Sequence, residues 1–261
     1  MSQEFHFQHC IVRTPSHSCL EGITTSAYLG PVDYAGAIRQ HESYIRALQA
    51  TGVKVTVLPA LEAYPDSCFV EDVAVITPYG AIVTNPGAPS RNGEKDEMVA
   101  TLKTFFPDEK IHYLTNPGTM DGGDVLLIEN CYYVGISRRT NVDGFCQFRE
   151  IVRGFGMDAV AVPVTDILHL KTGVVYVGEG RLLISGEFKT RPEFRYFERF
   201  EVPNEEAYGA NIIRMNGKII VASGYPSVSR KLREWGYDLI ETDTSEYKKI
   251  DGGLTCLSLR F

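Results

Sequence analysis

The sequence lacks several features that would point to whole classes of protein. No apolar run comes near the roughly 18 residues that a membrane-spanning helix needs, and the first residues lack the basic-then-apolar pattern of a secretion signal. The six cysteines include no CxxC pair, so we expect reduced thiols rather than a disulfide framework. The formal net charge of −7 disfavours nucleic acid as a main partner. These absences predict a soluble, cytoplasmic protein with no membrane partner.

Length and composition favour one large domain. The 261 residues are 44% hydrophobic and 23% charged, which matches globular rather than disordered proteins and allows a sizeable core. No Gly/Ser-rich or Pro-rich linker and no low-complexity segment divides the chain. We therefore expect a single domain over residues 1–261.

One short pattern recurs five times, at intervals of about 46 residues. In each copy a short apolar strand follows a small or acidic residue, and the equivalent positions are Val73, Val125, Val174, Ile212 and Leu257. A turn and a second strand come next in the first four copies. The strongest of these turns is Asn216-Gly217, a dipeptide typical of tight hairpins.

Helical patterns follow the hairpin in three copies. Apolar residues at helical spacing span 98–106, 145–155 and 228–235, and Ser227 is the expected N-cap of the last. A further strand follows each helix, over 111–114, 159–164 and 237–241. The third copy fits worst, because 188–206 is charged, aromatic and only weakly helical.

The fifth copy closes across the two ends of the chain. Its strands are expected at 254–259, 9–13 and 53–58. Its helix is expected at 33–50, with Tyr34, Ile38, Ile45 and Leu48 on one face.

A strand–strand–helix–strand unit cannot cover both of its faces alone. Five such units around an axis predict a pseudo-symmetric α/β propeller. The alternative is an ordinary α+β sheet with accidental spacing, and periodicity alone does not decide between them.

Polar residues stand at the equivalent inner positions of the five units. In a propeller these positions converge on one axis. They are Asp66, Glu71 and Asp72 in the first unit, Asp121 and Asp124 in the second, His169 in the third, Asn211 in the fourth and Cys256 in the fifth. The set contains a nucleophile, a general acid/base and several anionic groups, which suits catalysis on a cationic substrate.

Physical chemistry narrows that substrate. Carboxylates gathered in a partly dry site repel one another unless a cation joins them. A planar guanidinium binds two carboxylates through paired N–H groups and offers an electrophilic carbon to sulfur. A thiol at its ordinary pKa of about 8.5 needs activation by a histidine or by the charge of the substrate. If the substrate is an amino acid, Arg91 and Arg139 are candidate partners for its α-carboxylate.

Several motifs, in order along nearly the whole chain, resemble the dimethylarginine dimethylaminohydrolase family of the guanidino-group-modifying (pentein) superfamily. The motifs are RTPSHSCLEGITTS at 13–26, FVED at 69–72, PGAPSR at 86–91, MDGGDVL at 120–126, RTN at 139–141, LHLKTG at 168–173, ASGYP at 222–226 and YKKIDGGLTCLSLRF at 247–261. The resemblance implies the five-unit α/β propeller. It also implies cofactor-free hydrolysis of Nω-methylated arginines to citrulline plus dimethylamine or methylamine.

The resemblance also assigns roles by position. Cys256 matches the nucleophile, His169 the general acid/base, and Asp121 the carboxylate that contacts the guanidinium and steers the histidine. The matching substrate-binding positions are Glu71 and Asp72 for the guanidinium side, Asp66 for a polar contact in the same loop, Arg91 and Arg139 for the α-carboxylate, and Ile23 and Ile250 for the α-amino group through their backbone carbonyls. No metal site is expected, since the Cys, His and Asp residues lack paired ligand spacing.

Three alternatives stay open at this point. An arginine deiminase-type or other guanidine hydrolase would share the fold, and only the space around the distal nitrogens would distinguish it. A non-catalytic binding platform would have no reason to keep Cys, His and acid together. A helix face such as 33–50 could support a homodimer.

Overall fold

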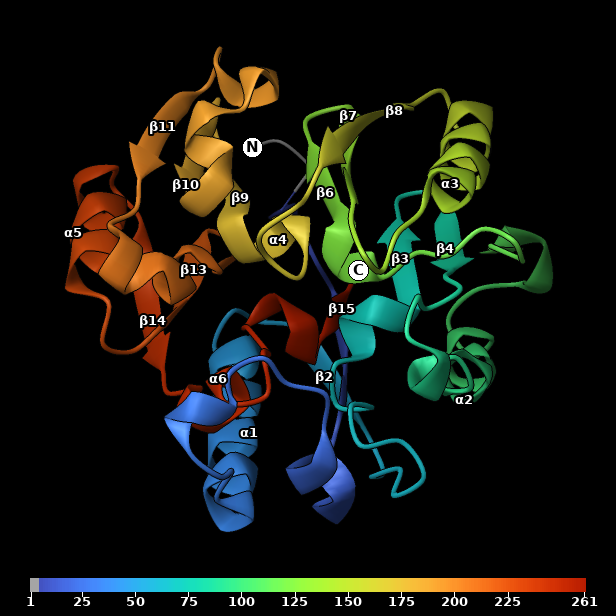
Figure 1. The fold of residues 1–261 in the computed structure, drawn as a ribbon, viewed down its shortest axis with the longest axis horizontal. Coiled ribbons are helices and arrows are strands. Elements are labelled where there is room, and N and C mark those ends of the chain that lie inside the picture. The colour runs from blue at the N-terminus through green and yellow to red at the C-terminus, as the bar shows by residue number, and fades with distance from the viewer. Residues whose placement is uncertain (1–4) are drawn as a thin grey trace. The chain divides into compact units, whose positions relative to one another are not determined.

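The computed structural model describes residues 5–261, which divide into two compact units. The first unit contains the chain up to Val70 together with Thr172–Phe261, and the second contains Glu71–Lys171. Five three-stranded sheets lie within the described residues, three in the first unit and two in the second (Figure 1).

All five sheets share one layout. The middle strand pairs antiparallel with the strand before it in the repeat and parallel with the strand after it. In the second unit the strands are β3 (Ala74–Thr77), β4 (Gly80–Val83) and β5 (Ile111–Tyr113), then β6 (Val125–Ile128), β7 (Cys131–Ile136) and β8 (Asp158–Pro163). The recurring sequence pattern therefore corresponds to a recurring sheet.

The first unit repeats this layout three times. Its strands are β9 (Val174–Gly178), β10 (Arg181–Ile184) and β11 (Glu198–Glu201), then β12 (Ile213–Met215), β13 (Lys218–Ala222) and β14 (Asp238–Thr242), and finally β15 (Leu259–Arg260), β1 (His9–Arg13) and β2 (Lys54–Leu58). Since β1 pairs with β15, strands from the two ends of the chain complete one sheet, as the sequence predicts.

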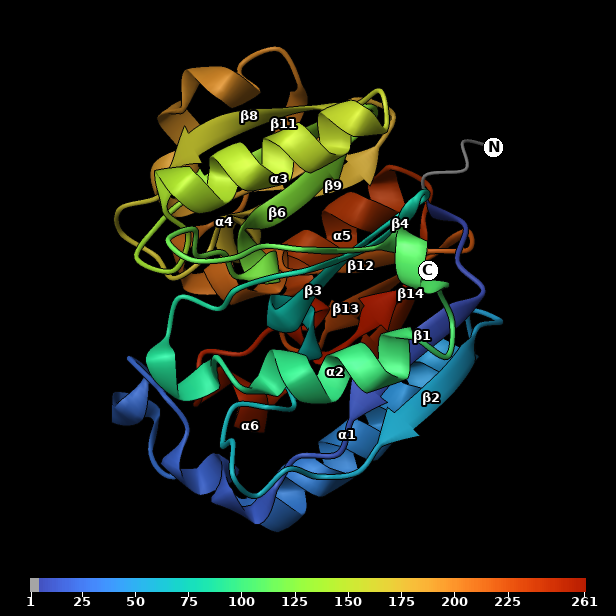
Figure 2. The same ribbon diagram turned by 90° about the vertical axis from the view of Figure 1, so that its right-hand side faces the viewer.

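The helices follow the middle strands in most copies (Figure 2). They are α1 (Tyr34–Gln49), α2 (Glu94–Leu102), α3 (Val142–Gly154) and α5 (Pro226–Glu234). Two shorter helices, α4 (Leu170–Gly173) and α6 (Ser245–Lys248), precede the first strand of the copies that begin with β9 and β15. The copy with β9 to β11 carries short 3-10 turns at Gly186–Thr190 and Pro192–Phe194 in place of a long helix. This is the copy that fits the repeat worst in the sequence.

Each unit has its own apolar core. In the second unit Phe148 and Val152 of α3 pack on Tyr132, Val134 and Ala159 of the adjacent sheet. In the first unit Tyr44 and Leu48 of α1 join a cluster with Val12, Leu254 and Leu257. Among residues 5–261, no helix has the length and apolar character that crossing a membrane requires.

Two expected helices differ from the sequence prediction. The buried face of α1 is formed by Ala37, His41, Tyr44, Ala47 and Leu48, while Tyr34, Ile38 and Ile45 are only partly buried. The Tyr44 hydroxyl explains the rotation, since it donates to the Leu254 carbonyl at 2.8 Å inside the core. The second helix, α2, ends at Leu102 rather than extending to 106.

Two local predictions are wrong. Ser227 does not cap α5, which begins at Pro226; instead Glu206 accepts the Ser227 backbone N–H at 2.9 Å. The expected strand at 254–259 is a 3-10 turn over Thr255–Leu257 followed by the two-residue strand β15. This difference matters for function, because Cys256 lies at the centre of that turn.

Candidate active site

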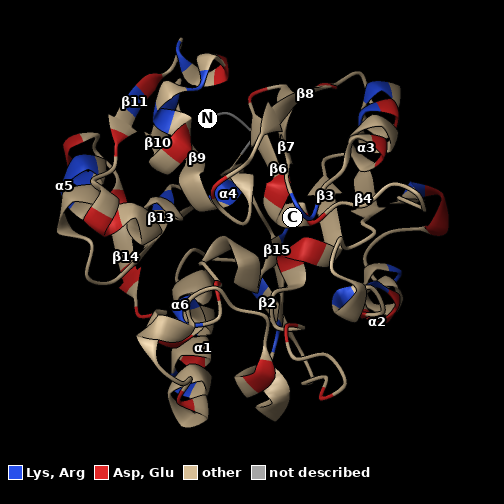
Figure 3. Ribbon diagram, in the orientation of Figure 1, with Lys and Arg blue, Asp and Glu red and all other residues tan. Residues whose placement is uncertain are grey.

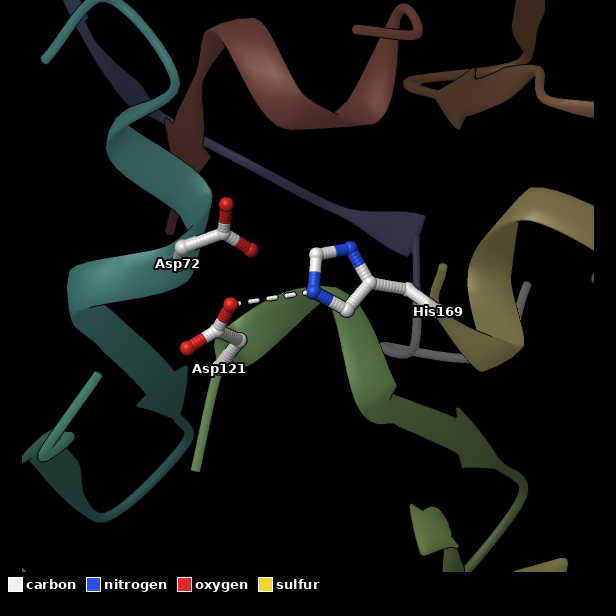
Figure 4. A group of neighbouring side chains, drawn as sticks. All are labelled: Asp72, Asp121 and His169. Carbon is white, nitrogen blue, oxygen red and sulfur yellow. Dashed lines mark hydrogen bonds and ion pairs between the residues drawn. The ribbon is translucent and has the colours of Figure 1, made fainter. Parts of the chain in front are cut away.

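Three side chains predicted to act together meet within the second unit. Figure 4 shows Asp72 and Asp121 directed toward the imidazole of His169. His169 Nε2 lies 3.0 Å from Asp121 Oδ2, and one potential ligand atom from each of the three residues lies within 4.8 Å of the others. All three residues are buried. The structure therefore places the predicted histidine beside two of the predicted carboxylates.

The DGG turn makes room for this cluster. Asp121 precedes the 3-10 turn Gly122–Asp124, and the Gly123 N–H donates to Asp72 Oδ1 at 3.0 Å. A Cβ atom added to Gly123 would lie 2.6 Å from His169 Nδ1 and 2.9 Å from Asp72 Oδ1. Because those contacts are too short, glycine is required for both side chains to approach this backbone.

Asp124 stabilises the backbone next to His169. Its fully buried carboxylate accepts hydrogen bonds from the Ser137 and Thr140 hydroxyls, each at 2.7 Å, and from the Leu170 N–H at 2.9 Å. Burial raises the pKa of Asp124, and the nearby His169 and the two hydroxyls oppose this. Since Leu170 follows His169, Asp124 fixes the backbone that carries the imidazole.

The imidazole is held in its charged form. Burial alone would lower the pKa of His169, but the charges of Asp72 and Asp124 and the hydrogen bond to Asp121 raise it to about 9. Burial acts against the ionised Asp121 carboxylate, yet the His169 hydrogen bond and charge lower the pKa of Asp121. At neutral pH the pair is therefore an imidazolium donating from Nε2 to a carboxylate.

Asp72, Asp121 and His169 also offer atoms that are close enough together to share a metal ion. A histidine must be neutral to coordinate a metal. The burial and the net negative charge of the two carboxylates suit an organic cation better.

Arg91 contacts one carboxylate of this cluster, that of Asp72, from a 3-10 turn after β4. Its buried guanidinium donates from Nη1 to Asp72 Oδ2 at 2.5 Å, and from Nε and Nη2 to the two oxygens of Glu94 at 3.0 and 2.8 Å. Glu94 opens α2, whose charged positions are marked in Figure 3. Glu94 is not among the residues predicted from the sequence. An acid three residues after a candidate arginine was the available signal.

Two further predicted substrate-binding residues of this unit, Arg139 and Glu71, have different surroundings. Arg139 Nη1 lies 3.6 Å from Asp121 Oδ2 and, among the described residues, has no hydrogen-bond partner although it is buried. Glu71 pairs with Lys171 at 2.6 Å. The substrate-binding roles of Arg91, Arg139 and Glu71 stay predictions.

A second group of predicted residues meets within the first unit. The Ile23 N–H donates to Asp66 Oδ1 at 3.1 Å. A Cβ atom added to the neighbouring Gly22 would lie 3.0 Å from Asp66 Oδ1 and 3.7 Å from Ile250 Cγ2. Ile23, Asp66 and Ile250 therefore lie around one glycine, although they are far apart in sequence.

Cys256 is also part of the first unit. It is half-buried against the core cluster of α1, and its Sγ accepts the Gly253 N–H at 3.4 Å. Cys19 is fully buried, and burial raises its pKa to about 11. Cys146 is exposed.

Solved structures define the class of this fold. The chain matches a structure of dimethylarginine dimethylaminohydrolase from Pseudomonas aeruginosa, a cysteine-to-serine variant complexed with citrulline. The TM-score is 0.96 and the identity 45%, over 98% of this chain and 100% of that one. The N-terminal domain of a cyanobacterial arginine dihydrolase gives a TM-score of 0.84 at 18% identity, which shows the fold alone. The predicted class, a five-unit α/β propeller of the pentein superfamily, is confirmed.

Sequence relatives define the family. A model described as N,N dimethylarginine dimethylhydrolase, eukaryotic, matches residues 32–193. The dimethylarginine dimethylaminohydrolase of P. aeruginosa is 46% identical over 98% of this chain and its own full length, and that of Streptomyces coelicolor is 35% identical over 96% and 95%. The chain belongs to the dimethylarginine dimethylaminohydrolase family.

Proposed function

We propose that this protein hydrolyses Nω-methylated arginines to citrulline plus dimethylamine or methylamine. The observation that carries the proposal is the buried cluster of Asp72, Asp121 and His169. This cluster lies in a chain that is 46% identical, over 98% of its length, to the dimethylarginine dimethylaminohydrolase of P. aeruginosa. The cluster combines anionic groups for a guanidinium with an imidazolium ready to donate a proton.

The proposed reaction begins with attack of the Cys256 thiolate on the guanidinium carbon. A C–S bond forms, and His169 donates its proton to the methylated nitrogen as the C–N bond breaks and the amine leaves. The product of this half-reaction is a thiouronium on Cys256. Water then attacks the same carbon and His169 accepts one of its protons. The C–S bond breaks to give citrulline and the free thiolate, and the second proton of the water passes to the released amine in solution.

The charge state of His169 supports the order of these steps. A pKa of about 9 means that the imidazole enters the reaction protonated at neutral pH, as a general acid. Once the proton has left with the amine, the neutral imidazole is the base for the attacking water. Asp121 orients the ring and stabilises its charged form.

We assign substrate recognition to the remaining predicted residues. Asp72, with Glu71, binds the guanidinium side, and Asp66 makes a polar contact in the same loop. Arg139 binds the α-carboxylate, which is supported by the buried Nη1 that has no hydrogen-bond partner among residues 5–261. Arg91 is the second carboxylate clamp. Binding there requires its guanidinium to exchange Asp72 or Glu94 for the substrate.

The backbone carbonyls of Ile23 and Ile250 hold the α-amino group in this proposal. Their positions on either side of Gly22 support a shared role, because both belong to the group around Asp66. An ammonium needs such acceptors when it leaves water.

Three further expectations accompany this function. We infer that residues 1–261 act as one domain, which is supported by the end-to-end match to a single solved relative. A homodimer and a cytoplasmic location stay predictions of the sequence. Light scattering of the purified protein tests the former, and microscopy of a tagged copy tests the latter.

Citrulline release tests the proposal directly. Asymmetric dimethylarginine, monomethylarginine and arginine are compared at matched concentrations, with Cys256→Ser as the inactive control. We expect the methylated substrates to have the higher kcat/KM. A higher kcat/KM for arginine would favour the deiminase-type alternative, and no citrulline from any of them would favour another guanidine or a binding role.

A further inference from the structure

Asn211 holds the turn that carries Cys256, although the proposed mechanism gives it no part. Its side-chain Oδ1 accepts the Thr255 N–H at 2.9 Å, and its Nδ2 donates to Thr255 Oγ1 at 3.1 Å. Asn211 and Thr255 are both buried. One amide side chain therefore fixes both the backbone and the side chain of the residue directly before the nucleophile.

The same amide also limits the position of Gly253. A Cβ atom added to Gly253 would lie 2.6 Å from Asn211 Oδ1. That contact is too short for any residue with a side chain, so Gly253 packs directly against Asn211. The Gly253 N–H is the group that donates to Cys256 Sγ.

Asn211 thus contacts both residues that set the environment of the sulfur. Thr255 determines where the 3-10 turn places Cys256, and Gly253 supplies a hydrogen bond that a thiolate accepts more strongly than a thiol. Tyr208, one turn earlier in the same segment, adds a third attachment by donating to the Gly252 carbonyl at 2.9 Å.

We propose that Asn211 is a positioning residue for the nucleophile, which keeps the Gly253 N–H directed at Cys256 Sγ and so favours the thiolate. This inference rests on the proposed role of Cys256, but not on the identity of the substrate. Asn211 occupies in the fourth repeat the position that Cys256 occupies in the fifth. The fourth repeat therefore supplies the side chain that positions the nucleophile of the fifth.

A merely structural role makes a different prediction. If Asn211 only stabilises the fold, its loss lowers the unfolding temperature and leaves the relative reactivity of Cys256 unchanged. The exposed Cys146 provides an internal reference for thiol reactivity in the same molecule, and the buried Cys10 reports loss of the folded state.

The test is the rate of iodoacetamide labelling at each cysteine, followed by peptide mass spectrometry from pH 6 to 10 on the whole protein without substrate. For Asn211→Ala we expect the Cys256/Cys146 rate ratio at neutral pH to fall roughly tenfold, with the midpoint of the Cys256 profile moved to higher pH. Gly253→Ala should lower the ratio as well, because its Cβ displaces the turn from Asn211.

The double variant Asn211→Ala/Gly253→Ala separates positioning from general damage. Since alanine at 211 removes the short contact, adding Gly253→Ala should change the ratio little further, and the two effects should not add. A wild-type ratio and midpoint in both single variants, with Cys10 still protected, would overturn the proposal. Because no substrate is present, that outcome is distinct from a failure to release citrulline.

Discussion

His169 Nε2 and Asp121 Oδ2 lie 3.0 Å apart, with both side chains buried and 48 positions apart in the sequence. Desolvation disfavours both charges. The neighbouring carboxylates and the hydrogen bond overcome it for His169, and the hydrogen bond and charge of His169 overcome it for Asp121. The relationship makes His169 an acid that is available throughout the neutral range.

The first prediction concerns the titration of this histidine. Histidine NMR should place the midpoint of His169 near the value of about 9, and Asp121→Asn should lower it, because the hydrogen bond to a charged partner is lost. The raised pKa adds stability that is complete below the ordinary value of 6.5 and is lost as pH rises through about 9.

His41 provides the contrast in the same spectra. Burial lowers its pKa to about 4, so its contribution to stability is lost as pH falls from 6.5 toward 4. A His169 midpoint at or below 6.5 would contradict the account of the charged pair.

The second prediction concerns the positioning of His169 by Asp124. Asp124→Asn should keep the shape of the side chain but weaken the bonds from Ser137, Thr140 and Leu170, because a neutral amide offers one acceptor oxygen in place of two. We expect kcat to fall roughly tenfold or more with KM changed less. Steady-state kinetics and the pH dependence of kcat check this.

Ser137→Ala serves as the milder control, since it removes one of the three donors. Unchanged kcat and an unchanged pH profile in Asp124→Asn would show that the carboxylate has no part in placing the imidazole.

The third prediction concerns the buried ion pair of Arg91 with Glu94. Arg91 pairs with two buried carboxylates, those of Asp72 and Glu94. Glu94→Gln removes the charge of one of them. Breaking a buried pair by removing one partner typically costs about 3–5 kcal/mol. Urea unfolding should show a loss of this order.

The exposed pair Lys103–Asp108 is the matched control. Its atoms lie 3.3 Å apart but both side chains are solvated, so Asp108→Asn should cost less than about 1 kcal/mol. Equal losses of unfolding free energy in the two variants would show that Arg91 and Glu94 do not form a stabilising buried ion pair.

The fourth prediction concerns the segment that contains Ile23. Asp251 accepts hydrogen bonds from the Thr25 N–H at 2.5 Å, the Thr25 hydroxyl at 2.9 Å and the Ser26 hydroxyl at 2.6 Å. Its φ of 57° favours glycine. Asp251→Gly should therefore release the segment without backbone strain, raising KM and speeding proteolysis at 22–26.

Asp251→Asn retains an acceptor and tolerates the same φ, so it should have the smaller effect. If KM and the proteolysis rate of Asp251→Gly equal those of the wild type, the contact does not hold Ile23 for substrate binding.

The sheets could be predicted from sequence because local signals define them. The strand at 9–13 has the predicted bounds, because a short apolar run marks it in the sequence. Even the sheet shared by the two ends of the chain followed from counting the repeats.

The parts that failed depend on contacts between distant segments. The buried face of α1 is set by Tyr44, whose hydroxyl bonds to residues more than 200 positions away. The 3-10 turn at Cys256 depends on Asn211, which an isolated apolar pattern at 254–259 cannot reveal. Glu94 was missed because it lies outside the PGAPSR motif, and its pairing with Arg91 shows only in the burial of both side chains.

The most direct test of the central claim is whether turnover passes through Cys256. Purified protein is mixed with asymmetric dimethylarginine, quenched in acid within the first turnovers, and examined by intact-mass and peptide mass spectrometry while citrulline is measured in parallel. The account predicts a covalent adduct that maps to Cys256, together with citrulline release that Cys256→Ser abolishes. Citrulline release that persists in Cys256→Ser would contradict it.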